Sequence, residues 1–164
     1  MAEDFTLRES IQLAITTEQL GQRFYEGLAR KFAEDKIVSE VFARLAEDEE
    51  DHEKQFERLL DRVPQEENQP ERFEVYQFLR ATAISEFFRK DFFARVDEIS
   101  TPAEALGKAL EFEKTTFLYY QAIRDVLGES EELDTIIEAE RHHVMAIAQV
   151  FVTDARFSSF SDSS

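Results

Sequence analysis

Residues 42–56 read FARLAEDEEDHEKQF, and this stretch decides the fold. Its apolar side chains, such as Leu45 and Phe56, recur at the three- and four-residue spacing that places them on one face of an α-helix. Between them the same face carries Glu49 and His52, which lie one helical turn apart because their spacing is i, i+3. The stretch therefore predicts an amphipathic helix whose inward face is interrupted by a Glu-x-x-His pair.

Signals for helix ends extend this pattern over the first part of the chain. A capping box at Thr6-Leu7-Arg8-Glu9 starts a helix, because the Thr hydroxyl and the Glu carboxylate satisfy backbone N–H groups of the first turn. Apolar residues at helical spacing continue this helix over about 6–33. The helix that contains 42–56 follows after a short break at 34–36 and ends at Pro64. A connection this short predicts an antiparallel helix pair.

A second helix pair is predicted toward the C-terminus. Thr101-Pro102-Ala103-Glu104 is another capping box, with Pro at the first helical position, where its missing N–H costs nothing. Gly128 is a stop signal for this helix, and Ser130 is an N-cap for the last one. The apolar stripe of the third helix is expected at Leu106, Leu110, Phe117, Tyr120 and Leu127. Because a crossover over 64–100 joins the two pairs, the expected fold is all-α, a four-helix bundle whose long crossover contains one or two short helices.

Each predicted helix has a gap in its apolar face, and a carboxylate fills every gap. The first and third helices carry a single Glu there, whereas the second and fourth carry a Glu-x-x-His pair; the six residues are Glu18, Glu49, His52, Glu113, Glu140 and His143. Ionised carboxylates in an apolar core are costly, so four of them facing one axis need compensation. Two divalent cations supply it, because four carboxylates offset four positive charges and each imidazole adds a neutral nitrogen ligand. The alternative is that these residues lie on solvated acidic faces.

The pattern of candidate ligands occurs twice in the chain. Glu18 and Glu113 are 95 positions apart, and so are Tyr25 and Tyr120. The two Glu-x-x-His pairs are 91 positions apart. Two copies of one helix pair produce such offsets, with a shorter turn in the second copy.

The six residues resemble the ligand set of ferritin-like di-iron carboxylate proteins, in which two helices give one Glu each and the other two give Glu-x-x-His. Within that superfamily the chain is most similar to the rubrerythrin-related branch, because Tyr25 follows Glu18 by seven residues and because of the stretch FARLAEDEEDHEKQF. The resemblance covers about residues 6–155. It implies a ferritin-like bundle at 1–155, and we expect a disordered tail at 156–164.

The resemblance also assigns roles to these residues. It implies a centre of two Fe ions, although carboxylate and imidazole ligands suit Mn and Zn as well. The ligands would divide into two bridges and two terminal pairs: Glu49 and Glu140 as bridges, Glu18 with His52 on one ion, and Glu113 with His143 on the other. Tyr25 is a candidate for a catalytic role beside the ligands. The chain departs from rubrerythrins in having no cysteine, and so no rubredoxin domain, and in carrying Thr116 where they have an extra carboxylate.

These implications predict a di-iron protein of rubrerythrin type that oxidises Fe(II) with peroxide or dioxygen and receives electrons from an external donor. Such a protein would scavenge peroxide as an oxidoreductase or handle iron as a ferroxidase. Two alternatives stay open: a metal-storage or buffering protein, and a non-catalytic helical module that docks a partner. Metal content separates the interaction module from the others, and oligomer size separates storage, because a mineral needs a hollow shell of many subunits.

Charge and composition limit the partners further. The 164 residues carry a formal net charge of -17, which repels nucleic-acid phosphates and anionic membranes and attracts metal ions. We therefore expect no nucleic-acid or membrane partner, and an N-terminus without a signal-like segment favours a cytoplasmic protein. The dense aromatic residues of 71–99 predict an apolar interface and a homodimer, with four candidates for its centre: Phe87, Phe88, Phe92 and Phe93.

Overall fold

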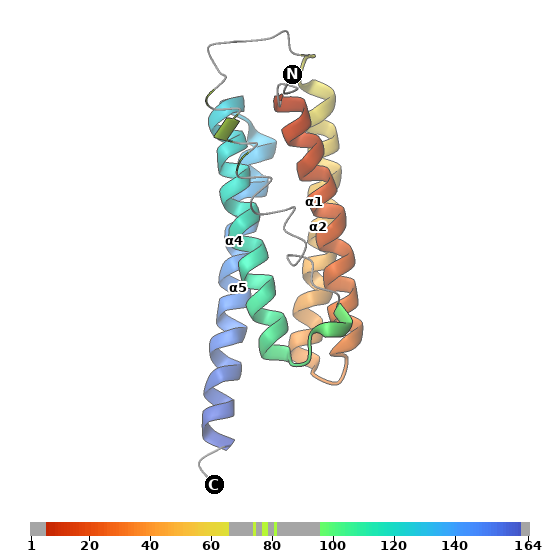
Figure 1. Cartoon of the computed structure of the whole chain (residues 1–164), viewed down its shortest axis with the longest axis vertical. Helices are drawn as coiled ribbons and strands as arrows, with labels where there is room; N and C mark the ends of the chain where they lie inside the picture. Colours follow the sequence, from red (N-terminus) through yellow and green to blue (C-terminus); the bar gives the residue numbers. More distant parts are fainter. Residues whose placement is uncertain (1–5, 66–73, 75–76, 79–80, 82–95, 162–164) are drawn as a thin grey trace.

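The structure, a computed structural model, describes residues 6–65, 74, 77–78, 81 and 96–161. These ranges contain four long helices and one 3₁₀ turn, which are α1 (Leu7–Lys31), α2 (Lys36–Arg62), η2 (Val96–Glu98), α4 (Pro102–Leu127) and α5 (Glu131–Ser161). The four helices pack against one another as a bundle (Figure 1). The predicted all-α four-helix bundle is thus confirmed.

The helices begin at the capping residues that the sequence indicates. At the start of α1 the capping box is complete, because Thr6 Oγ1 accepts from the backbone N–H of Glu9 and Glu9 Oε2 accepts from that of Thr6. Thr101 caps α4 by accepting from the N–H of Glu104 at 3.1 Å. The Glu104 carboxylate accepts from the N–H of Ser100 at 3.0 Å. In the second predicted capping box, the Thr101 hydroxyl therefore accepts as expected, but the Glu104 carboxylate accepts from Ser100 and not from Thr101.

The turn between α4 and α5 also follows its sequence signals. Gly128 follows α4 with a φ of 86°, a left-handed backbone value that glycine adopts without steric cost. Ser130 Oγ accepts from the N–H of Leu133 at 3.3 Å and caps α5. The glycine thus ends α4, and the serine N-cap starts α5 within a few residues.

The chain runs along α1 and back along α2, then along α4 in the direction of α2 and back along α5 (Figure 1). α1 packs on α2 and α4, and α5 packs on α4 and α2, so these packed pairs are all antiparallel. The long crossover joins the two parallel helices, α2 and α4. Its last part returns to the end of α1, where Lys31 Nζ donates to the carbonyl oxygens of Val96 and Asp97 at 2.8 and 3.1 Å.

The bundle interior is apolar toward both ends and polar in the middle. Ile11 and Leu133 lie toward one end, Leu28 and Leu106 lie toward the other, and all four are 0% exposed. At the first of these ends the Tyr119 hydroxyl donates to the Ser10 carbonyl at 2.8 Å and ties α4 to α1. The apolar ends thus hold the four helices in register around the polar middle.

α4 buries a wider face than its predicted stripe. Phe112 and Tyr119, which lie outside that stripe, are at most 2% exposed, whereas Leu110 and Phe117 are only partly buried. Leu118 is 60% exposed. The reason is that α4 packs on two helices, α1 and α5, which cover different sides of it. A single stripe chosen from the spacing of the largest apolar residues describes only one of these sides.

Some predictions stay untested in the described ranges. The short helices expected within 71–99 lie mostly outside them, and the four candidates for a dimer interface lie wholly outside: Phe87, Phe88, Phe92 and Phe93. The homodimer therefore stays a prediction. α5 continues to Ser161, within the stretch where a disordered tail is expected, and the domain boundary at 155 stays a prediction too. No helix in the described ranges is long and apolar enough to cross a membrane.

Candidate metal centre

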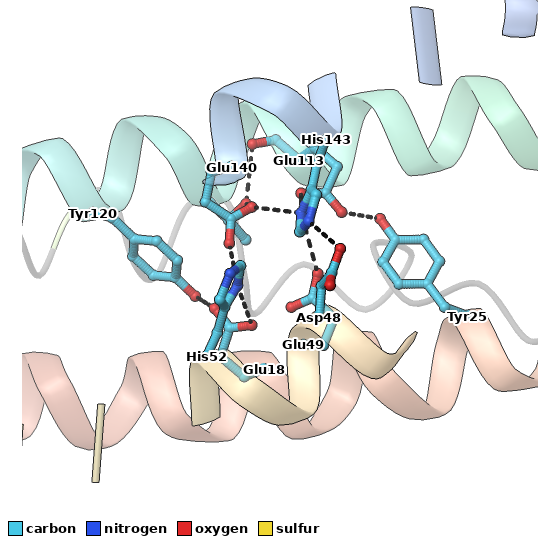
Figure 2. A network of polar contacts seen from close by, with 10 residues as sticks. Glu18, Tyr25, Asp48, Glu49, His52, Glu113, Tyr120, Glu140 and His143 are labelled. Atoms are coloured by element: carbon cyan, nitrogen blue, oxygen red, sulfur yellow. Dashed lines mark hydrogen bonds and ion pairs between the residues drawn. The ribbon is translucent and has the colours of Figure 1, made fainter. Parts of the chain in front are cut away.

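Six polar side chains from all four helices point toward one another in the middle of the bundle (Figure 2). α1 and α4 give one carboxylate each, while α2 and α5 give a carboxylate and an imidazole each. Each residue is at most 6% exposed; they are Glu18, Glu49, His52, Glu113, Glu140 and His143. The structure thus brings together all six residues that the sequence singles out.

One side of this group is built around His52 of α2. Its Nδ1 atom lies 2.9 Å from Glu140 Oε1 and 3.6 Å from Glu18 Oε2. The other oxygen of Glu18 accepts a hydrogen bond from the Tyr120 hydroxyl of α4. Glu18 is therefore held with one oxygen toward the imidazole and the other toward α4.

The other side is built around His143 of α5. Its Nδ1 atom lies 3.3 Å from Glu113 Oε2, 3.5 Å from Glu140 Oε2 and 4.0 Å from Glu49 Oε1. The Tyr25 hydroxyl of α1 donates to the remaining oxygen of Glu113. Glu140 thus faces both imidazoles, one with each of its oxygens.

The two Glu-x-x-His pairs form the tightest part of the group. Glu49, His52, Glu140 and His143 each offer one ligand atom, and these atoms all lie within 4.8 Å of one another. The two imidazole rings stack with their centroids 5.3 Å apart. Atoms this close can bind the same pair of ions.

Seven buried atoms of the group have no hydrogen-bond partner among the described residues. Two are the Nδ1 atoms of the histidines and five are carboxylate oxygens, including both oxygens of Glu49. His52 Nδ1 and Glu140 Oε1 are close enough for an ion pair but do not form a hydrogen bond. We call such an atom unpaired when it makes no hydrogen bond. Each unpaired buried polar atom lowers the stability of a fold by about 1–3 kcal/mol, so native proteins contain few of them. Here seven such atoms converge on one place, which is expected of a site that binds a ligand from outside the chain.

Burial and mutual repulsion alter the charges of the carboxylates. Burial, with a further contribution from Glu140, raises the pKa of Glu113 to about 8. Burial and the charges of Glu18 and Glu113 raise the pKa of Glu49 well above its usual value. Burial acts on Glu140 in the same direction, but the adjacent imidazoles of His52 and His143, with a contact to Glu113, together outweigh it and hold the pKa of Glu140 well below its usual value. The metal-free centre therefore keeps protons on part of its carboxylates.

Neighbouring carboxylates raise the pKa of both imidazoles. Burial opposes protonation of His52, but Glu140 and Glu18 together outweigh it and raise the pKa of His52 to about 10. For His143 burial is likewise outweighed, by Asp48 and Glu113, and its pKa rises to about 12. Protonated imidazoles thus partly offset the carboxylates in the metal-free chain. A metal ion must displace these protons in order to bind the nitrogen atoms.

Two tyrosines flank the group on opposite sides (Figure 2). Burial, together with the carboxylate charges around them, raises the pKa of both Tyr25 and Tyr120 well above the usual value. Both hydroxyls therefore stay protonated and donate, Tyr25 to Glu113 and Tyr120 to Glu18. A catalytic role for Tyr25 stays a prediction.

Residues 9–98, more than half of the chain, match the family model described as Rubrerythrin. The chain belongs to the Rubrerythrin family. The matched range includes Glu18, Glu49 and His52, and the ligand candidates of α4 and α5 lie beyond it. No curated protein and no solved structure matches the chain.

The donor set of the site fits two divalent ions. Four carboxylates offset four positive charges, and two imidazole nitrogens complete a set that suits iron, manganese or zinc. The seven unpaired atoms supply donors from every one of the six residues. Family membership and the Glu/His cluster together indicate a binuclear metal site and support a di-iron carboxylate protein.

Two further side chains contact the ligand candidates. Asp48 Oδ2 lies 3.0 Å from His143 Nε2, and its side chain is 42% exposed. Thr116 Oγ1 lies within hydrogen-bond distance of Glu140 Oε2, at 3.3 Å. Sequence reasoning noted Thr116 only as a departure from the family and did not identify Asp48, because Asp48 is one of several acidic residues around Glu49. Helical spacing does not show which of these reaches across to α5.

Three other side chains of α5 that could serve as metal ligands are exposed. The Glu138 side chain is 52% exposed and the His142 side chain is 67% exposed. Met145 is 62% exposed. Glu140 is therefore the inward carboxylate of α5, and His143, which is 6% exposed, is its inward imidazole.

Proposed function

We propose that these six residues hold two iron ions and that the centre oxidises Fe(II) with peroxide or dioxygen. The observation that carries the proposal is the convergence of seven unpaired buried atoms from four helices in a member of the Rubrerythrin family. An interaction module has no need of such atoms at its core, because each of them weakens the fold when no cation is bound.

The distances support a division of the ligands into bridging and terminal ones. Glu140 is assigned as a bridge, because its two oxygens face His52 and His143 separately. The same role is proposed for Glu49, because the sequence repeat makes it equivalent to Glu140 and neither of its oxygens makes a hydrogen bond. The terminal pairs are Glu18 with His52, 3.6 Å apart, and Glu113 with His143, 3.3 Å apart.

Two ferrous ions held here would supply the two electrons that convert one hydrogen peroxide and two protons into two water molecules. The 164 residues contain no cysteine and so offer no thiolate-bound redox centre, which supports an electron donor outside these residues for restoring the ferrous state.

The tyrosines position the terminal carboxylates for this chemistry. Tyr25 holds a proton against Glu113 Oε1, and Tyr120 holds one against Glu18 Oε1. The Oε2 atoms of both carboxylates stay unpaired and face the imidazoles. Each tyrosine thus fixes which carboxylate oxygen is left to bind metal.

The proposal is tested by metal analysis of anaerobically purified, iron-replete protein, with absorption spectra before and after hydrogen peroxide or air. We expect two iron ions per chain and a spectral change on oxidation. Glu49→Gln should lose metal, whereas the matched variant Glu50→Gln, which alters an exposed carboxylate on the next residue, should retain it. A folded sample that takes up almost no iron would contradict the proposed centre.

Reaction with the oxidants separates turnover from buffering. If iron binds but neither peroxide nor dioxygen oxidises it, the redox role is wrong and the metal-buffering alternative takes its place. A shell of many subunits in sedimentation analysis would instead favour storage.

A further inference from the structure

The internal repeat allows the surroundings of the two halves of the site to be compared position by position. The offset of 91 that relates Glu49 to Glu140 also relates Asp48 to Ala139. The offset of 95 that relates Glu18 to Glu113 also relates Gly21 to Thr116. The six ligand candidates are thus duplicated, but at both of these neighbouring positions only one copy carries a polar side chain.

In the half of the site that contains Glu113, the imidazole has an acidic partner. His143 Nε2 lies 3.0 Å from Asp48 Oδ2, while its Nδ1 faces the carboxylates and is unpaired. An acceptor at Nε2 fixes the neutral imidazole in the tautomer that leaves the Nδ1 lone pair free. It also raises the basicity of the ring and holds its orientation.

In the half that contains Glu18, the described residues place no such partner beside the imidazole. The position equivalent to Asp48 is Ala139, which has no polar side chain and is itself only partly buried. His52 Nε2 has no hydrogen-bond or ion-pair partner among the residues that the structure describes, and the ion pairs of His52 are all made through Nδ1. The two imidazoles therefore differ in their support although their ligand atoms are alike.

The two proposed bridging carboxylates, Glu49 and Glu140, also differ in their polar neighbours. Thr116 Oγ1 lies 3.0 Å from the Glu113 carbonyl oxygen and 3.3 Å from Glu140 Oε2, the carboxylate oxygen that faces His143. At the equivalent position Gly21 offers no group to Glu49, and a Cβ built there would lie 3.3 Å from Glu49 Oε2 and 3.0 Å from the Phe112 ring. Both oxygens of Glu49 are unpaired. At the two positions compared, both polar contacts thus lie on the side of Glu113 and His143.

We propose that the two metal positions are inequivalent, and that Asp48 makes the position at Glu113 and His143 the one that fills first and releases its ion last. The inference rests on the proposed binuclear centre and concerns how its two positions are occupied. The position at Glu18 and His52 is then the exchangeable one. Asp48 acts as a positioning residue, because it contacts Nε2 of His143, whereas Nδ1 is the ring atom that faces the carboxylates.

Outer partners of a metal-bound histidine typically change metal affinity by about 10–100-fold. If the two metal positions differ in affinity by this much, metal binding occurs in two separable steps. Titration of the metal-free full-length chain with Co²⁺, followed by calorimetry and visible absorption, measures both steps. Salt at about 0.15 M screens weak binding of Co²⁺ to the acidic surface.

We expect the wild-type chain to bind two Co²⁺ ions in two steps of different affinity. Asp48→Ala should weaken the tighter step by about 10–100-fold and leave the weaker step in place. Asp51→Ala removes the same charge from an exposed position on the same helix and should change neither step. Ala139→Asp should strengthen the weaker step and bring the two closer together, which a purely structural role of Asp48 does not explain.

The outcomes separate this inference from the function on which it rests. Two equal steps in the wild-type chain, or an equal effect of Asp48→Ala on both steps, would overturn the inequivalence and leave the binuclear centre intact. Binding of no Co²⁺ would overturn both. If Asp48→Ala does not fold, Asp48→Asn keeps the shape and removes the charge, and Ala139→Asp tests the same idea from the opposite side.

Discussion

The ends of the bundle and its middle are equally buried, yet burial has opposite consequences in the two regions. Toward the ends, Leu28 and Leu106 are 0% exposed among apolar neighbours, and their removal from water stabilises the fold. In the middle, Glu18 and Glu113 are also 0% exposed but each keeps an unpaired oxygen. Burial there opposes folding until protons or cations neutralise the charge. The apolar ends therefore hold the polar middle in an arrangement that is unfavourable without its metal.

The largest expected effect lies in an apolar end. Leu28→Ala should lower the free energy of unfolding by about 2–5 kcal/mol, because a cavity replaces a fully buried side chain. The loss should be the same with and without metal, as measured by denaturant titration. Leu118→Ala, at a position that is 60% exposed, is the control and should change stability little. A loss at Leu28 that depends on metal would mean that the ends and the middle are not separate.

Metal binding should stabilise the middle by a comparable or smaller amount. Free metal at 100 times its dissociation constant adds about 2.7 kcal/mol to the free energy of unfolding, because only the folded chain brings the ligands together. Thermal unfolding of iron-free protein with and without Mn²⁺ measures this gain. His52→Ala should abolish much of the gain, whereas His142→Ala, which alters an exposed imidazole, should preserve it. An equal gain in both variants would contradict the assignment of His52.

The pH dependence of the metal-free protein tests the charges of the middle. The folded chain retains protons on Glu113, with a pKa of about 8, and on His52, with a pKa of about 10, which the unfolded chain releases near pH 4.5 and 6.5. Raising the pH from 7 to 8 therefore favours the unfolded state, by about 1.4 kcal/mol for each extra proton retained. Denaturant titrations in the presence of a chelator measure the slope.

Bound metal should reverse this slope, because metal ions replace the protons and bind more tightly as the pH rises. The control is Glu113→Gln, in which the slope between pH 7 and 8 should be shallower. If the stability of the metal-free wild-type chain instead rises between pH 7 and 8, the buried carboxylates are already ionised in the folded chain.

The smallest effect is expected for a single carboxylate of the middle. In metal-free protein Glu113→Gln should be neutral or stabilising, on the order of 1 kcal/mol, because it removes one of the mutually repelling carboxylates. With metal bound the sign should reverse, because a ligand is lost. Glu111→Gln, at an exposed position of the same helix, should have no effect in either state. A large loss of stability in metal-free Glu113→Gln would reveal a structural partner of this carboxylate.

Much of the fold follows from local patterns that the sequence displays. The capping box at Thr6 and the glycine at 128 place helix ends that the structure reproduces, because capping depends on neighbours within one turn. The inward positions of Glu49 and Glu140 follow from helical spacing in the same way. For α4 the predicted stripe misses Phe112 and Tyr119, because contact with two other helices widens the buried face.

By itself the sequence determined four helices and the six inward polar residues, since helical period, i, i+3 spacing and the internal repeat are all properties of the chain alone. Only the tertiary structure decided which outer side chains touch them. Tyr25 meets Glu113 across 88 positions of sequence, and Asp48 meets His143 across 95. Such contacts depend on how far each helix is rotated about its axis against its neighbours, and no local spacing encodes that rotation.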